Sequence, residues 1–192
     1  MLDLTLPATP AVVTPAENEV MFVTNADLRE SANETCWPVE AKYEDLLTKA
    51  LAKLGKTARR AHPIKTEKNH GFIAGQREGS DVFAAIDPDA PVIVLMTAWQ
   101  YSHHIAPSLV THRGPVLLLA NFDGTWPGLV GMLNMAGSLT ALGRPYSRLW
   151  SENFDDPFFM DGLKAWLETG IVEHDLGHMT EVTADHSLMQ SE

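Results

Sequence analysis

The sequence is poor in cysteine and in basic residues, and it has no long hydrophobic run. Cys36 is the single cysteine, which excludes an internal disulfide framework and fits a reducing cytoplasm. No apolar segment approaches the roughly 18 residues that a membrane-spanning helix needs. There are 14 lysines and arginines against 25 aspartates and glutamates, a formal charge of −11. Because an acidic protein repels phosphate groups and anionic lipids, we expect neither nucleic acid nor a membrane as partner.

Several signatures of catalysis are also missing. The chain has no G-x-G-x-x-G, no Walker loop and no G-x-S-x-G motif. His103 and His104 are adjacent, so they point in different directions and chelate poorly. His174 and His178 are four residues apart, but their flanks are strand-like, which argues against a metal-binding helix. We therefore expect no catalytic residue and no metal ligand in this chain.

What the sequence does contain is an alternation of apolar strand-like runs with amphipathic helical segments. This alternation predicts an α/β fold built on an open, parallel, doubly wound sheet of about five strands, flavodoxin- or Rossmann-like, with helices on both faces. The predicted strands are 20–24, 57–64, 90–97, 115–120 and 146–150, with a short one at 171–175, and the predicted helices are 39–54, 73–86, 128–142 and 158–168.

Helix-end residues fix several of these boundaries. Pro38 suits the first turn of the helix at 39–54, and Gly55 suits the position just past its end. Asp155 and Asp156 precede the last helix, where carboxylates usually serve as caps. The domain organisation that follows is a flexible N-terminal arm at 1–18, an α/β domain at 19–182, and a truncated or linker tail at 183–192.

Three loops follow predicted strands and are rich in polar and aromatic residues. Ligands on open parallel sheets bind at the carboxyl ends of the strands, which directs attention to loops 25–31, 98–104 and 121–128. A tryptophan beside amide and carboxylate groups is common in carbohydrate sites, because the ring stacks on the apolar face of a sugar. The alternative is that the loop aromatics, Trp99 and Trp126, merely cap the sheet.

Taken in order along the chain, these loops resemble the N-terminal part of the L-fucose isomerase and L-arabinose isomerase family. The resemblance spans 20–182. It rests on R-E-S at 29–31, on W-Q-Y at 99–101, and on N-F-D-G-T-W-P-G at 121–128, which is followed by a helix of small residues and a Gly-x-Pro turn at 143–145.

The resemblance implies a cytoplasmic aldose–ketose isomerase, which is an intramolecular oxidoreductase. In this family a divalent metal, usually manganese, holds the sugar oxygens while carboxylates move a proton through an enediol. Family members are oligomers in which an N-terminal domain can close over the active site of another subunit. They are also much longer, and their metal ligands and acid/base carboxylates lie in a C-terminal part that this chain lacks.

Substrate contact is therefore what the resemblance carries to this chain. It implies Trp99 first, then Arg29 and Tyr101, and position at the strand ends adds Asn121 and Asp123. We expect the N-terminal part of a metal-dependent isomerase that supplies contacts to a small sugar and an oligomer interface, with the catalytic domain elsewhere. The alternatives are a stand-alone flavodoxin-like module that binds a sugar without catalysis, and a domain that serves only assembly.

Overall fold

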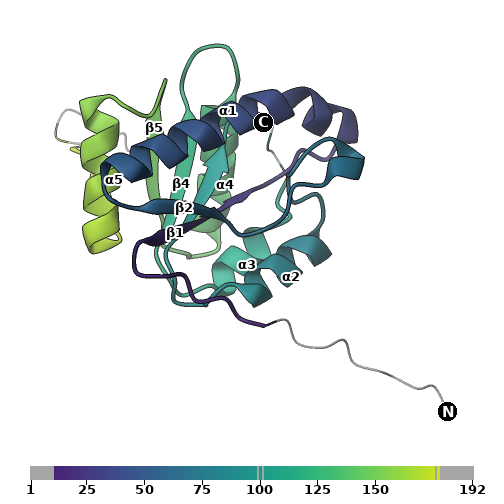
Figure 1. Cartoon of the computed structure of the whole chain (residues 1–192), viewed down its shortest axis with the longest axis horizontal. Helices are drawn as coiled ribbons and strands as arrows, with labels where there is room; N and C mark the ends of the chain where they lie inside the picture. Colours follow the sequence, from purple (N-terminus) through teal and green to yellow (C-terminus); the bar gives the residue numbers. More distant parts are fainter. Residues whose placement is uncertain (1–10, 99, 101, 176, 178–192) are drawn as a thin grey trace, which may run out of the picture.

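A single parallel sheet organises the molecule. The structure, a computed structural model, describes residues 11–98, 100, 102–175 and 177. Five strands lie in the order β2-β1-β3-β4-β5, all parallel, which confirms the predicted open α/β sheet (Figure 1). The strands are β1 (Glu19–Thr24), β2 (Thr57–Arg60), β3 (Val92–Met96), β4 (Val116–Asn121) and β5 (Ser147–Ser151).

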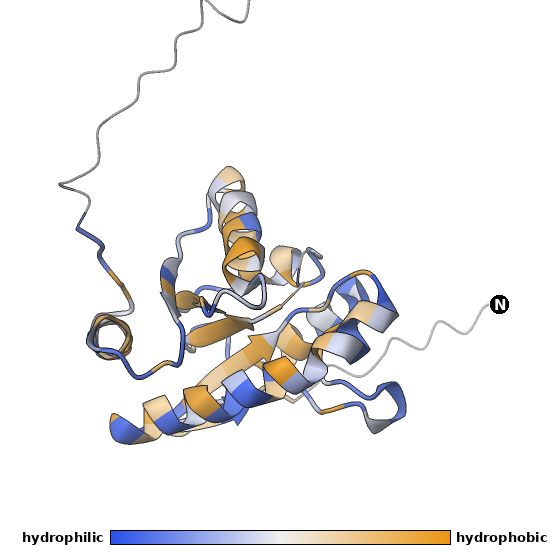
Figure 2. Ribbon diagram, turned by 90° about the horizontal axis from the view of Figure 1, so that it is seen from above, coloured by the Kyte–Doolittle hydropathy of each residue, from blue (hydrophilic) through white to orange (hydrophobic). Residues whose placement is uncertain are grey.

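Helices cover both faces of this sheet. They are α1 (Glu30–Lys53), α2 (Gln76–Ala85), α3 (Ala106–Thr111), α4 (Gly128–Ala141) and α5 (Pro157–Thr169), with a 3-10 turn at Thr66–Lys68. Residues of α1 and α5 share one core with Ile93 and Leu95 of β3, whereas α2, α3 and α4 share another with Val92 and Val94. Successive strand residues point to opposite faces, so the continuous apolar runs of β3 and β4 supply both cores. Figure 2 shows strands in the hydrophobic colour lying between the helices of the two faces.

Helix α1 begins earlier than its sequence indicates. It starts at Glu30 and contains Pro38, so the prediction that Pro38 opens the helix is wrong. Pro38 has no N–H to donate to the preceding turn, which normally disfavours this position. Buried residues on both sides of it, among them Cys36 and Tyr43, anchor both halves of the helix in the interior. Tertiary packing therefore outweighs the local penalty.

Two further elements differ from the prediction, and one predicted helix cap is confirmed. The short helix α3 was not predicted, and segment 171–175 forms no strand; it meets β5 through a bond from the Val172 N–H to Ser147 Oγ. Asp156 caps α5 as predicted, accepting from the Phe159 N–H at 2.9 Å.

The two chain ends were predicted to be an arm and a tail. In the predicted arm, Val13 exchanges backbone hydrogen bonds with Ala85 and Asp87, beside the end of α2. Residues 1–10 and the predicted tail, 183–192, lie outside the described residues. None of the helices in the described part of the chain combines the length and the hydrophobicity that a bilayer crossing requires.

Candidate functional site

The carboxyl edge of the sheet carries a row of polar residues on the side that α1 covers. Alternation along the strands places Thr24, Thr97, Asn121 and Ser151 in line with the apolar residues of that core, and Arg60 lies above the Phe22 ring. Each of the five strands thus contributes one member, at its last position or just past it. We call this row, Arg60, Thr24, Thr97, Asn121 and Ser151, the polar layer.

Glu40 reaches the polar layer from the middle of α1. It is completely buried, and its Oε2 accepts hydrogen bonds from Thr97 Oγ1 and, at 3.2 Å, from Gln100 Nε2. Its Oε1 has no hydrogen-bond partner among the described residues. Burial raises the pKa of Glu40 to about 7, although hydrogen bonds from Thr97 and Gln100 and the charge of Arg60 act against the rise.

Gln100 fixes the start of the loop that follows β3. Its Oε1 accepts from the backbone N–H groups of Thr97 and Ala98, and its Nε2 donates to the Leu95 carbonyl as well as to Glu40. One side chain thus satisfies two orphan donors and one carbonyl at the end of a central strand. The loop in which the sequence predicts ligand contacts is therefore tied to α1.

Arg60 closes the polar layer at the β2 edge. It forms an ion pair with Glu44, donates to the Gly71 carbonyl at 2.8 Å, and lies 5.2 Å from the centroid of the Trp37 ring. Burial lowers the pKa of Arg60 to about 10, and the Glu40 carboxyl group opposes that change. The guanidinium remains charged at neutral pH, so it supplies positive charge near Glu40.

On the other side of the sheet, Asn25 joins the end of β1 to the loop after β3. Its Nδ2 donates to the Ser102 carbonyl at 2.6 Å and lies 3.0 Å from Ser102 Oγ, which itself donates to the Ala26 carbonyl. Asn25 is buried, and its Oδ1 has no partner among the described residues. The strand order reverses between the neighbouring strands β1 and β3, because the chain continues from β1 to β2 on one side and from β3 to β4 on the other. In open parallel sheets, ligands usually bind in the crevice at this point.

The predicted contact residue Arg29 lies at this same edge, just before α1. Its side chain is 65% exposed and pairs with Asp27, with 2.7 Å between Arg29 Nε and Asp27 Oδ1. Asp27 is in turn held by Asn33, which accepts from its N–H and donates to its carbonyl. An exposed guanidinium beside a strand end can contact a ligand oxygen, although here it already has a carboxylate partner.

Asn121 and Asp123, predicted as contacts from position alone, are brought together in the turn before α4. Asp123 Oδ1 accepts from the N–H groups of Thr125 and Trp126, and Asn121 Nδ2 lies 3.3 Å from it. Tyr43 Oη lies 2.9 Å from Asp123 Oδ2. Partial burial opposes ionisation of Asp123, but the hydrogen bonds outweigh it and lower its pKa to about 2.

Asn121, unlike Asp123, has a side-chain oxygen without a hydrogen-bond partner among the described residues. Asn121 is completely buried, and its Oδ1 has no partner among the described residues. The other two predicted contacts, Trp99 and Tyr101, lie outside the described residues.

Sequence reasoning selected neither Glu40 nor the Asn25–Ser102 contact, and it passed over Gln100. Gln100 and Ser102 lie in a loop that the sequence marked as polar, but nothing local distinguishes them from their neighbours. Glu40 had a usable signal, because it falls on the helical face defined by Cys36, Tyr43 and Leu47, where a charged residue is out of pattern.

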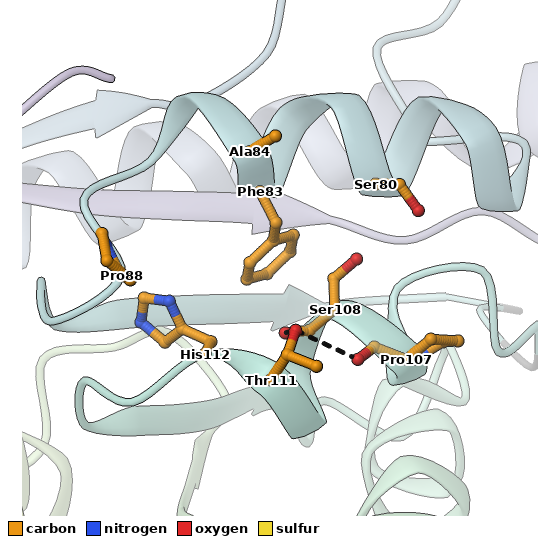
Figure 3. Close-up of a pocket in the computed structure, with 8 residues that line it drawn as sticks. All are labelled: Ser80, Phe83, Ala84, Pro88, Pro107, Ser108, Thr111 and His112. Carbon is orange, nitrogen blue, oxygen red and sulfur yellow. Dashed lines mark hydrogen bonds between the residues drawn. The ribbon is translucent and has the colours of Figure 1, made fainter. Parts of the chain in front are cut away.

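A separate cleft lies away from this edge, between α2 and α3. It has a volume of about 380 Å³, and Figure 3 shows its lining residues, Ser80, Phe83, Ala84, Pro88, Pro107, Ser108, Thr111 and His112. The His112 ring packs edge-on against Phe83 and donates from Nε2 to the Ala90 carbonyl at 2.8 Å. Burial lowers the pKa of His112 and keeps the imidazole neutral. The cleft contains none of the residues predicted from the sequence.

Comparison with models of known protein families and with curated protein sequences gives no match. The loop resemblance and the geometry of the carboxyl edge are therefore the grounds on which a function is proposed.

Proposed function

We propose that this chain is the N-terminal domain of a metal-dependent aldose–ketose isomerase acting on L-fucose, L-arabinose or a related sugar, and that its carboxyl edge contacts the sugar. One observation carries the proposal. Hydrogen-bonding side chains follow the ends of three neighbouring strands at that edge, and two of them, Asn25 and Asn121, keep a buried amide oxygen without a partner among the described residues.

A sugar would meet the needs of such an edge. A buried acceptor without a donor costs about 1–3 kcal/mol, and a hydroxyl group or a water molecule removes that cost. Each sugar hydroxyl is both donor and acceptor, so it suits an edge built from amide, hydroxyl and guanidinium groups, of which the Arg29 side chain is the exposed one. Trp99 lies in the sequence between Ala98 and Gln100, and on this proposal it stacks on the apolar face of the sugar.

The proposal assigns the proton transfer and the metal to another domain. Within the described residues, no group of three His, Cys, Asp or Glu side chains is placed to hold a metal ion. The Asp27 carboxylate is paired with Arg29, and the Asp123 carboxylate accepts hydrogen bonds from the N–H groups of Thr125 and Trp126. As they stand, these two carboxylates do not fit a manganese site. We therefore derive no step through the metal from this chain; its own part is to bind and orient the substrate, and to assemble with other subunits.

Sugar binding by the isolated chain is the first test. Titration with L-fucose and L-arabinose, followed by calorimetry or by NMR shifts, should show saturable binding that Trp99→Ala weakens at least about tenfold, the loss expected of an aromatic stacking contact. Tyr146→Ala removes an aromatic ring just before β5, at the opposite edge of the sheet, and should leave the affinity unchanged. Unchanged affinity in a folded Trp99→Ala variant would remove the stacking contact from the proposal.

An aldose–ketose conversion assay with manganese tests the isomerase assignment. The chain is assayed alone and after mixing with a C-terminal catalytic part encoded at the same locus. Activity only in the mixture supports the two-part isomerase. Activity of the chain alone would mean that catalytic groups lie within it, against the proposal. Sugar binding with no activity in either case would favour the stand-alone binding module.

A further inference from the structure

Helices α3 and α4 form the one uncharged stretch of the helical surface that the structure describes. The six residues of α3 and the fourteen of α4 include no Asp, Glu, Lys or Arg, although the chain has a formal charge of −11. The neighbouring ten-residue helix α2, by contrast, carries Arg77, Glu78 and Asp81. Helices α3 and α4 contact each other on the face of the sheet opposite α1 (Figure 1).

This uncharged area also exposes large apolar side chains. Val130 is 54% exposed, Leu133 48%, Leu142 56% and Val110 38%. A groove of about 640 Å³ runs between the two helices, and apolar residues form most of its lining, namely Ala106, Pro107, Val110, Ala141 and Leu142. Contiguous exposed apolar area of this kind marks interaction sites. We call Val110, Val130, Leu133, Gly137, Ala141 and Leu142 the α3–α4 surface.

The exposed stripe of α4 is bulky in its first half and small in its second. Val130, Leu133, Gly137 and Ala141 follow one another at helical spacing and are all exposed. A Cβ added at Gly137 would have no heavy atom within 4 Å, so there is open space above this position. The groove toward α3 flanks the small half, since Ser138, Ala141 and Leu142 line it.

Such a stripe is complementary in shape to the same stripe of a second copy that packs against it in the antiparallel direction. A two-fold axis between positions 135 and 136 places Val130 opposite Ala141 of the second copy and Leu133 opposite its Ser138, beside Gly137. The bulky half of each α4 then fills the small half and groove of the other, as an isologous interface requires.

The electrostatics also favour a second copy as the occupant. Two chains of equal negative charge repel each other, and they meet least repulsion through a surface that carries no charge. Two polar groups beside the stripe already have a partner in the same chain, because His103 Nε2 lies 2.8 Å from Ser138 Oγ and 3.2 Å from Asn134 Oδ1. Covering the stripe therefore leaves these two groups paired.

We propose that the protein forms a two-fold symmetric dimer through the α3–α4 surface, with the α4 helices of two copies packed antiparallel. The proposal does not rest on sugar binding or isomerase activity, because it follows from the shape and charge of α3 and α4 alone.

The experiment is a mass measurement by light scattering and analytical ultracentrifugation on the full chain across the micromolar to millimolar range. We expect a dimer, or a larger oligomer of even number. Leu133→Glu should raise the dimer dissociation constant roughly a hundredfold or more, because the interface would bury an unpaired carboxylate. Gly137→Trp should also give monomers, since the added ring fills the small half of the stripe.

The matched control is Ile171→Glu, which changes the charge equally at a side chain that is 57% exposed outside α3 and α4. It should remain dimeric, and circular dichroism should show all three variants folded. A wild-type chain that stays monomeric throughout would overturn the proposal and favour a different protein as occupant. An exclusively trimeric chain, or equal loss of association in Leu133→Glu and Ile171→Glu, would overturn it too.

Discussion

Glu40 is the residue whose chemistry departs most from its sequence type. A carboxyl group on a helix normally lies in water, yet this one is completely buried against Thr97 and Gln100. Ionisation leaves a charge in the interior with one oxygen that has no partner among the described residues, and Arg60, whose charge favours ionisation, already forms an ion pair with Glu44. The protonated form is therefore favoured in the folded state more than in the unfolded chain.

This burial predicts a specific pH dependence of stability. The pKa of Glu40 rises from 4.5 to about 7 on folding, so its contribution is fully present below pH 4.5 and is lost as the pH rises through 7. The loss is on the order of 3 kcal/mol. Glu40→Gln, which cannot titrate, should therefore gain stability relative to wild type by up to this amount between pH 5 and pH 8, measured by urea unfolding.

The comparison with Glu40→Gln matters because other buried groups also titrate. Burial, together with the charge of Arg60, lowers the pKa of His62 to about 3, which makes stability rise with pH over part of the same range. The control is Glu34→Gln, at an exposed position on the same helix. It makes the same substitution at a side chain that is exposed to solvent. A stability difference for Glu40→Gln that does not vary with pH would show that folding leaves the pKa of Glu40 unchanged.

At the scale of single elements, two of the three glycines of α4, Gly128 and Gly137, differ in the space around them. Gly128 lies where the helix starts against the sheet, and a Cβ there would be 2.6 Å from the Met96 carbonyl and closer still to Asn121 Oδ1. Gly137 lies in open space on the outer face.

Alanine substitutions distinguish these two positions. Gly128→Ala should lower the free energy of unfolding by about 1–3 kcal/mol, because the methyl group has no room. Gly137→Ala should raise it by about 0.5–1 kcal/mol, because alanine loses less conformational freedom in a helix. Denaturant unfolding of both variants at the same low protein concentration measures the two changes. Equal effects would mean that the helix start is looser than the packing at Asn121 indicates.

Helix boundaries show how far local signals reach. Asp156 caps the start of α5 as the sequence predicted, because a capping carboxylate acts within a few residues, and the left-handed Gly170 ends the helix. The predicted start of α1 was wrong, because the residue before the helix, Arg29, makes no side-chain cap that the sequence could have signalled. There the neighbouring residues Asp27 and Asn33 bond each other across the helix start, a contact that the local pattern does not indicate.

For the whole molecule, net charge decides how self-association responds to salt. Each copy carries −11, and the α3–α4 surface contributes none of that charge. Raising the ionic strength from about 0.01 M to about 0.15 M shortens the screening length from roughly 30 Å to roughly 8 Å. The dimer dissociation constant should therefore fall severalfold, as sedimentation equilibrium at the two salt concentrations would measure. A dissociation constant that rises with salt would indicate an interface held by ion pairs.

The sequence by itself determined the class of fold and the position of most elements. Continuous apolar runs such as Val92–Met96 are typical of strands covered on both faces, and their alternation with helices favours parallel crossovers. It also located the polar loops, because strand ends and turn residues are local features. Asn121 and Asp123 were predicted as contacts in this way, and the turn does bring the two side chains together.

The tertiary structure alone decided the strand order and the partners of the buried polar groups. Local periodicity carries no information about which strands lie side by side, so neither the order β2-β1-β3-β4-β5 nor the meeting of Asn25 with Ser102 follows from it. Glu40 lies 57 residues from Thr97 and 60 from Gln100 in sequence. Their contact exists because α1 packs across the ends of strands, and only that packing turns an ordinary helical glutamate into a buried acid.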